Sequence, residues 1–252
     1  MRLGIITDIH NNLPALKTVV EYLEKQHCDK IVCCGDIIGI GPYPEETVQF
    51  ISKLPNVISV RGNHDDYLVK GMPTVIPNEE GMDYGEIQHH QWEHSLLSKS
   101  SVDFLKKMPD RQELFVENHK ISVMHYCMDQ EGKYVKYVPN PSKQDAEMMM
   151  SDIDSDIVIV GHDHKRTIQR TENQWYINMG SLGCPGTDRN IARAGILTVT
   201  EAIVEVEPIE LTYHVEEVVA EINKLCYPDA ENIKKFFFGI NDARREIADE
   251  FI

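Results

Sequence analysis

The sequence predicts an α/β fold, because short apolar runs typical of buried strands alternate with segments of helical periodicity over residues 3–60. The order strand-helix-strand-helix-strand favours parallel strands joined by right-handed crossovers. At 252 residues, with 42% hydrophobic and 26% charged residues, the chain has ordinary globular composition and can bury a sizeable core. We therefore expect a globular α/β protein rather than a disordered chain.

The first three strands are predicted at residues 3–7, 30–34 and 57–60, each an apolar run that ends in polar residues. Between them, apolar residues recur at helical spacing from about residue 13 to 26, after a capping asparagine and a proline. A second helix is expected over residues 45–54. Residues 3–60 therefore supply the parallel strands at the centre of the predicted sheet.

The alternation stops after residue 66, and residues 67–110 contain no convincing strand. We interpret 67–110 as a helical insertion beside the strand ends, placed to act as a lid, and 1–252 as one domain. Beyond the insertion we expect a hairpin (114–116, 121–124), a helix (142–150), a strand (156–160), a second hairpin (167–171, 174–177), two strands (195–200, 203–206) and a helical C-terminal tail (215–252).

The charge and composition exclude several classes of function. A formal net charge of −16 would repel a phosphate backbone, so we expect no extended nucleic-acid binding. No run of about 18 apolar residues is present and the N-terminus is charged too early for a signal peptide, so no membrane association is expected. The six cysteines show no metal-binding spacing and indicate free thiols in a reducing cytoplasm.

Five predicted strands end in groups that can bind metal ions or transfer protons. Residues i and i+2 of an extended segment point the same way, so Asp-x-His and His-x-His can each aim two donors at one point. Strand ends in open α/β sheets also collect ligands. The mixture of oxygen and imidazole donors suits Mn, Fe, Zn or Co rather than calcium. The residues are Asp8 and His10, Asp36, Asn63 and His64, His125, then His162 and His164.

A structural reading competes with this one, because a single Asn-His-Asp cluster also makes an ordinary capped turn. The recurrence of metal-binding side chains at five predicted strand ends favours a metal centre. The remaining histidines lack this context and are interpreted as solvated or as packing within the insertion, with three of them kept as candidates in the lid: His89, His90 and His94.

The sequence resembles the calcineurin-like metallophosphoesterases, and in particular their small prokaryotic phosphodiesterase branch. The resemblance rests on five blocks in the family's order, which are Asp8-x-His10, Gly35-Asp36, Gly62-Asn63-His64-Asp65, His125 and Gly161-His162-x-His164. It implies a four-layer α-β-β-α sandwich of two mixed sheets flanked by helices. It also implies two divalent metal ions, manganese or iron first, with zinc, nickel or cobalt as alternatives.

The family pattern assigns a role to each matching residue. It places Asp8, His10 and His164 on one metal and Asn63, His125 and His162 on the other, with Asp36 bridging them. A metal-bridging hydroxide would then attack phosphorus directly. The centre would give this acidic chain the positive charge needed to hold phosphate.

Three further residues take expected roles from the same resemblance. His64 would protonate the leaving oxygen or steady the equatorial charge of the phosphoryl group, and Asp65 would orient its imidazole and raise its pKa. Arg61 matches an arginine that grips phosphate in related phosphatases, although a salt bridge is an equal contender. The chain departs from the family at Asp163, which could face the metals or point away, and Arg189 or Arg193 could replace a missing phosphate-binding arginine.

We therefore expect a metal-dependent hydrolase of phosphoric ester bonds that acts on a small phosphodiester or nucleotide polyphosphate. A diadenosine polyphosphate hydrolase and a protein phosphatase are alternatives. A non-catalytic scaffold of the same fold, as in the retromer subunit, is a further alternative, although such proteins tend to lose the histidine that matches His64. The sequence leaves a homo-oligomer open.

Overall fold

The computed structural model describes residues 1–78, 81–184 and 186–240. In chain order the elements are β1 (Arg2–Ile6), α1 (Leu13–Lys25), β2 (Lys30–Cys33), α2 (Pro44–Lys53), β3 (Val57–Ser59), α3 (Asn63–Val69), α4 (Tyr84–Leu96), α5 (Lys99–Lys107), β4 (Arg111–Val116), β5 (His119–Met124), α6 (Lys143–Met149), β6 (Ile157–Val160), β7 (Thr167–Arg170), β8 (Trp175–Asn178), the short 3-10 helix η1 (Gly186–Asp188), β9 (Ile191–Val199), β10 (Val204–Thr212), α7 (Val215–Leu225) and α8 (Ala230–Phe237).

Helix α1 shows how local sequence sets the first crossover. The Asn12 side chain accepts a hydrogen bond from the backbone amide of Ala15 and so caps the helix. The apolar stripe that includes Leu16, Val19 and Leu23 is fully buried. The helix therefore packs on the sheet while the chain returns to start β2 parallel to β1.

The first sheet, which we call sheet A, has the strand order β10-β9-β1-β2-β3. Strands β1, β2 and β3 are parallel, as the sequence predicted. Strands β9 and β10 form a long antiparallel hairpin, and β9 pairs with β1. The carboxyl ends of β1, β2 and β3 therefore lie at one edge of sheet A.

The second sheet, sheet B, has the order β4-β5-β6-β8-β7. Strands β5, β6 and β8 are parallel, and β4 and β7 are antiparallel edge strands. Both predicted hairpins are thus present, β4 with β5 and β7 with β8. Sheet B is mixed, like sheet A.

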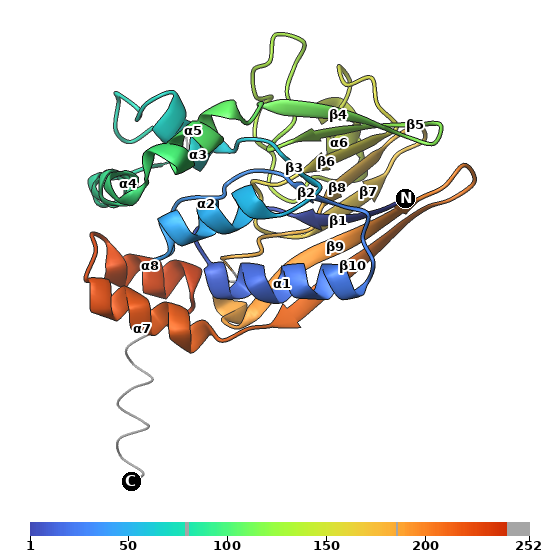
Figure 1. Cartoon of the computed structure of the whole chain (residues 1–252). Helices are drawn as coiled ribbons and strands as arrows, with labels where there is room; N and C mark the ends of the chain where they lie inside the picture. Colours follow the sequence, from blue (N-terminus) through green and yellow to red (C-terminus); the bar gives the residue numbers. More distant parts are fainter. Residues whose placement is uncertain (79–80, 185, 241–252) are drawn as a thin grey trace.

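The two sheets and their flanking helices form layers (Figure 1), and three apolar clusters join these layers. Residues such as Leu3 and Val32 of sheet A and Val123 and Ile159 of sheet B pack between the two sheets. The other face of sheet A is covered by α1, α2, α7 and α8, and that of sheet B by α6. The expected four-layer arrangement of two mixed sheets flanked by helices is therefore confirmed.

Helices from two distant parts of the chain meet over the strand ends. Trp92 of α4 stacks on Tyr227, which follows α7, with ring centroids 4.5 Å apart. The Tyr227 hydroxyl also donates to the carbonyl of Ile40, 3.0 Å away. Within the predicted insertion, α4, α5 and the end of α3 are helical, whereas residues 70–78 and 81–83 are not, and the predicted tail contains α7 and α8. Residues 79–80 of the insertion and 241–252 of the tail lie outside the described part.

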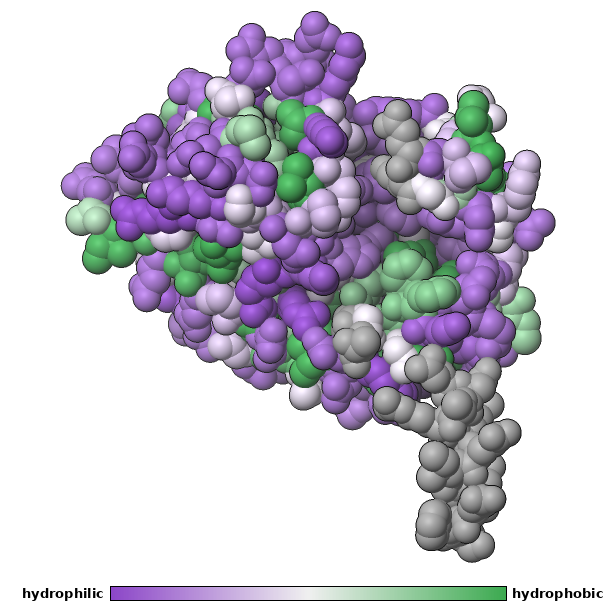
Figure 2. Space-filling model, turned by 180° about the vertical axis from the view of Figure 1, so that it is seen from behind, coloured by the Kyte–Doolittle hydropathy of each residue, from purple (hydrophilic) through white to green (hydrophobic). Residues whose placement is uncertain are grey.

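The face of the molecule drawn in Figure 2 is mostly hydrophilic, in keeping with the acidic composition. Within the described ranges, no helix has the length and apolar character needed to cross a bilayer. All six cysteines are free thiols. Cys33 and Cys34 face opposite sides of the sheet, the first in the helix-covered cluster and the second between the sheets.

Candidate metal centre

The predicted metal ligands come together where the strand ends of both sheets meet. Sheet A contributes residues that follow β1, β2 and β3, and sheet B contributes residues that follow β5 and β6. Most of these side chains are buried or half-buried although they are polar or charged. The residues brought together are Asp8, His10, Asp36, Asn63, His125, His162 and His164.

One set of donors surrounds His10. Its Nε2 atom lies 3.1 Å from Nε2 of His164 and 3.6 Å from Oδ2 of Asp36. The His164 Nε2 atom lies 3.7 Å from Oδ1 of Asp8. Two ligands about 2.1 Å from one ion lie at most about 4.2 Å apart, so this spacing fits a shared cation.

A second set surrounds His125. Its Nε2 atom lies 2.9 Å from the Asn63 Oδ1 atom and 3.3 Å from Oδ2 of Asp36. The His162 Nδ1 atom lies 3.1 Å from the same Asn63 oxygen and 3.3 Å from His125 Nε2. Asp36 Oδ2 therefore lies within reach of both sets of donors.

Backbone carbonyls fix the orientation of two imidazoles. The Nδ1 atom of His125 lies 2.8 Å from the carbonyl oxygen of Cys34, and Nδ1 of His10 lies 3.3 Å from that of Ile38. A carbonyl can only accept a hydrogen bond, so each contact favours the tautomer with hydrogen on Nδ1. The Nε2 lone pair is then free to bind a metal.

The backbone is strained at the same strand ends. Asp8, His10, Asp36 and His162 have φ between 48° and 69°, in the left-handed region that side chains other than glycine rarely adopt. Such residues persist only when surrounding contacts hold them, and they gather at functional sites. Because these four residues lie together, the loops at the strand ends indicate a functional site rather than a contribution to stability.

The electrostatics of the centre are dominated by Asp36. Burial alone would raise its pKa, but the imidazoles of His125 and His64 hold the pKa well below its usual range. Burial opposes the charging of His125, yet Asp36 raises its pKa to about 10. Burial lowers the pKa of His10 to about 3. Without a cation, the group therefore combines the buried Asp36 carboxylate with a protonated His125 and a neutral His10. A metal ion bound there would have to displace the proton of His125.

These residues fit a divalent cation. Asp8 is fully buried and Asp36 is only 2% exposed, and buried carboxylates are costly unless a positive charge faces them. The donor types, imidazole nitrogen with carboxylate and amide oxygen, suit Mn, Fe, Zn or Co. The structure thus has His and Asp groups that could bind metal.

Asp65 does not make the contact expected of it. Its Oδ1 atom accepts hydrogen bonds from the backbone amides of Ile37 and Ile38, and its Oδ2 atom accepts one from Gly62. Among the described residues, the His64 Nδ1 atom has no hydrogen-bond partner. Burial lowers the pKa of His64 well below its ordinary value, instead of the expected rise. Asp65 orders the backbone around Asp36 rather than the imidazole.

Arg61 is engaged in the salt bridge that the sequence left as an alternative. Its Nε atom lies 2.8 Å from Oδ1 of Asp66, and its guanidinium also pairs with Asp110 and donates to the carbonyl of Met108. The side chain is only 10% exposed. These contacts tie β3 and α3 to the end of α5, so the guanidinium is occupied in holding the insertion.

We expect Arg61→Ala to lower the free energy of unfolding by about 1–3 kcal/mol, because it removes the hydrogen bonds of a largely buried guanidinium to Asp66, Asp110 and the carbonyl of Met108. Lys70 still pairs with both carboxylates. Turnover by the fraction that remains folded should change little. Chemical denaturation and kcat/KM measure the two quantities, with exposed Arg170→Ala as the control. A large loss of kcat/KM at unchanged stability would instead support phosphate binding by Arg61.

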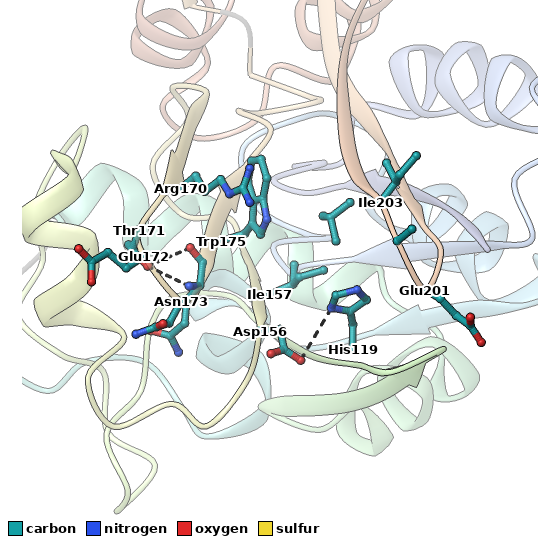
Figure 3. Close-up of a pocket in the computed structure, with 13 residues that line it drawn as sticks. His119, Asp156, Ile157, Arg170, Thr171, Glu172, Asn173, Trp175, Glu201 and Ile203 are labelled. Carbon is teal, nitrogen blue, oxygen red and sulfur yellow. Dashed lines mark hydrogen bonds and ion pairs between the residues drawn. The ribbon is translucent and has the colours of Figure 1, made fainter.

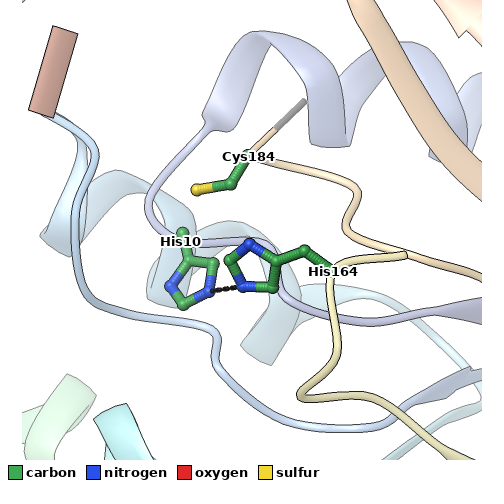
Figure 4. Close-up of side chains that lie close together, drawn as sticks. All are labelled: His10, His164 and Cys184. Carbon is green, nitrogen blue, oxygen red and sulfur yellow. Dashed lines mark hydrogen bonds between the residues drawn. The ribbon is translucent and has the colours of Figure 1, made fainter. Parts of the chain in front are cut away.

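Two residues near the centre were not anticipated. Cys184 lies with its Sγ atom within 4.8 Å of ring nitrogens of His10 and His164 (Figure 4). Burial raises the pKa of its thiol well above its ordinary value. Glu93 of α4 is fully buried and accepts hydrogen bonds from the Asn11 side chain and the Gly39 amide. In the sequence, only the His-x-x-Glu spacing at residues 90–93 could have indicated a role for Glu93.

The departures from the family pattern are also placed by the structure. The Asp163 carboxylate accepts a hydrogen bond from the amide of Asn140, 2.7 Å away, and is 7% exposed. Arg193 lines a cavity of about 420 Å³ together with the predicted ligand His164, whereas Arg189 is not among the lining residues.

A further cavity of about 420 Å³ lies away from the centre (Figure 3). It is bordered by the β7–β8 turn, the β9–β10 turn and the paired side chains of His119 and Asp156. None of the predicted ligands lines it, so we do not associate it with the chemistry of the strand ends.

Comparison with known proteins agrees with this geometry. A family model described as "Calcineurin-like phosphoesterase superfamily domain" matches residues 1–202. The chain belongs to this superfamily. The calcineurin-like match ends before β10, α7 and α8.

Several relatives of this calcineurin-like protein are archaeal. An uncharacterised protein of Methanocaldococcus jannaschii is 27% identical, with 90% of this chain and 94% of the relative covered. A phosphodiesterase of the same organism is 23% identical, with 78% of this chain and 92% of the relative covered. The crystal structure of a hypothetical protein from Pyrococcus horikoshii OT3 is 19% identical with a TM-score of 0.80, covering 95% of this chain and 99% of its own, and supports the fold.

Proposed function

We propose that this calcineurin-like protein is a binuclear metallophosphoesterase that hydrolyses phosphodiesters or nucleotide polyphosphates. The observation that carries the proposal is the pair of donor sets on either side of Asp36, whose Oδ2 atom lies 3.6 Å from His10 Nε2 and 3.3 Å from His125 Nε2. A family relative named as a phosphodiesterase supports the reaction type.

In this proposal Asp36 would be shared by two divalent cations, manganese or iron first, with zinc, nickel or cobalt as alternatives. Bound there, the cations would neutralise phosphoryl charge and lower the pKa of water from 15.7 towards about 7. One would be held by Asp8, His10 and His164 and the other by Asn63, His125 and His162. Attack by water on phosphorus is direct, so no side chain forms a covalent intermediate.

His64 is the proposed proton donor to the leaving oxygen. It packs against His10 with ring centroids 4.8 Å apart, and its backbone amide donates to Oδ1 of Asp36. Burial keeps its imidazole neutral, so it needs a nearby anion to become protonated. A bound phosphoryl group would supply that anion and raise the pKa of His64 in the complex.

The cavity beside His164 supports a substrate with more than one charged or bulky group. Lys165, Arg166 and Arg193 line it, and so does Phe237 of α8. Arg166 and Arg193 both pair with Glu210, and Arg193 also pairs with Asp188 of the cavity wall. Three cationic side chains against these two carboxylates leave one net positive charge on these residues. A second phosphate or the far half of a diester would fit there. The helices of the insertion (67–110) would then act as the lid on the other side.

The proposal is tested by a panel of metals and substrates. Metal-free protein should be inactive. Manganese or iron should restore hydrolysis of bis-p-nitrophenyl phosphate or of one class of nucleotide polyphosphate, in preference to hydrolysis of p-nitrophenyl phosphate. Cyclic nucleotides, dinucleoside polyphosphates and phosphopeptides complete the panel. Failure of every metal to produce turnover on any substrate would contradict the proposal.

The same panel addresses the alternatives. Hydrolysis confined to dinucleoside polyphosphates would indicate a diadenosine polyphosphate hydrolase, and hydrolysis confined to phosphopeptides would indicate a protein phosphatase. Absence of turnover with metal bound would indicate a scaffold. The free state of all six cysteines supports our placement of the enzyme in the reducing cytoplasm.

A further inference from the structure

A second group of metal-binding side chains lies on the insertion, outside the predicted ligand set. Glu86 and His90 are four residues apart on α4, so both project from one face of the helix. One donor atom from each and one from His64 all lie within 4.8 Å of one another. Two imidazoles and a carboxylate are a ligand set that binds Zn²⁺.

The buried ring of His90 has one nitrogen engaged and one without a partner. Its Nδ1 atom lies 2.6 Å from Oε1 of Glu93, and both side chains are 0% exposed. Its Nε2 atom is buried and has no hydrogen-bond partner among the described residues. A histidine whose Nδ1–H donates to a carboxylate and whose Nε2 lone pair is free has the arrangement typical of a metal ligand.

Glu93 is itself held in place. Its Oε2 atom accepts hydrogen bonds from the Asn11 side chain, at 2.7 Å, and from the Gly39 amide, at 2.8 Å. The carboxylate therefore cannot turn away from His90 without losing two buried hydrogen bonds. This contact fixes the direction in which the free His90 nitrogen points.

The distance between Glu86 and His90 also fits a shared ion. The Glu86 Oε1 atom lies 3.8 Å from His90 Nε2, too far for a hydrogen bond. It is within the roughly 4.2 Å that separates two ligands on opposite sides of a zinc ion. The rings of His64 and His90 lie with their centroids 5.0 Å apart.

The space between these residues is open and acidic. Glu86, His90 and His64 line a cavity of about 210 Å³, and Asp83 and Asp229 line it as well. No lysine or arginine is among the lining residues. The cavity can hold a cation with its remaining waters, and its carboxylates favour positive charge.

We infer that Glu86, His90 and His64 form a further divalent-cation site, best suited to Zn²⁺, between the insertion and the predicted catalytic histidine. Occupation of this site engages the His64 imidazole, which then cannot give its proton to a leaving group. Zinc in excess of the main centre therefore inhibits turnover. The inhibitory effect rests on the proposed function, whereas the binding of the ion does not.

The binding test compares the zinc content of the full-length protein and its variants after equilibrium dialysis against Zn²⁺. We expect wild type to bind one equivalent more than Glu86→Gln or His90→Gln. Exposed Glu46→Gln, on α2, removes the same charge as a matched control and should bind as wild type does. Glu93→Gln should weaken this site by about 10–100-fold, as loss of a partner to a ligating histidine does.

The activity test adds Zn²⁺ to manganese-loaded enzyme. Wild type should lose turnover as zinc rises, and Glu86→Gln should keep its basal turnover and require at least about tenfold more zinc for the same loss. Equal zinc content in wild type and both variants would overturn the site. If the variants bind one zinc equivalent less but zinc inhibits them as strongly as it inhibits wild type, the inferred role of His64 is overturned. An inactive wild type that still binds the extra equivalent would count against the proposed function alone.

Discussion

Asp36→Asn is expected to abolish hydrolysis of every phosphodiester and nucleotide polyphosphate tested. The substitution preserves the size of the side chain and replaces a buried anion with a neutral amide. Asp36 Oδ2 faces imidazole nitrogens of both donor sets, at 3.6 Å and 3.3 Å, so both proposed cations lose the charge that they share. Turnover with manganese and bound metal per chain are the two measurements.

The matched control for this change is Asp152→Asn, which neutralises an exposed aspartate in the turn after α6. It should keep full turnover and full metal content. A folded Asp36→Asn protein that retains turnover would eliminate a bridging carboxylate from the mechanism, whatever its metal content. Circular dichroism of the variant separates loss of the site from loss of the fold.

His64→Gln is expected to lower kcat by about 10²–10⁴-fold, the usual contribution of a positioned acid. Bound metal should fall by no more than the proposed extra zinc equivalent, because His64 is not among the ligands predicted for the main centre. The loss should depend on the leaving group. Hydrolysis of a p-nitrophenyl diester, whose leaving oxygen needs little protonation, should suffer less than hydrolysis of an alkyl diester.

A comparison of two substrates in one variant removes differences in protein quality. Equal losses on aryl and alkyl diesters would show that His64 stabilises the phosphoryl charge and does not protonate the leaving group. Exposed His27→Gln is the control and should match wild type on both substrates. Unchanged kcat on the alkyl diester would exclude His64 from the reaction.

The elements with strong local signals could be predicted from the sequence. The order of the first three strands and two helices and both sheet B hairpins agree with the structure. The start of β9 was missed, because Arg193 interrupts its apolar run. In the sheet, Arg193 pairs in register with Glu210 of β10, and their side chains form an ion pair. Pairing with β10 along its whole length defines the start of β9, and the local apolar pattern does not show this pairing.

The same distinction applies to the candidate site. The position of polar residues at strand ends was enough to predict which side chains would converge, and the family resemblance divided them into two sets. The expected i and i+2 alternation of an extended segment was wrong, because Asp8, His10 and His162 have left-handed φ. The roles of Asp65 and Arg61 depended on partners elsewhere, in the loop after β2 and at the end of α5. The buried Glu93 was beyond reach for the same reason, since its partners are Asn11 and Gly39.

The division of the ligands between the two sheets couples metal content to folding. Each proposed cation would take side chains from the loops of sheet A and from those of sheet B, for example His10 with His164 and Asn63 with His125. The ions would thus add cross-links between two layers that are also joined by apolar contacts and by hydrogen bonds such as the one between His125 and the carbonyl of Cys34. By mass action, free metal concentration would then set how readily the halves of the sandwich separate.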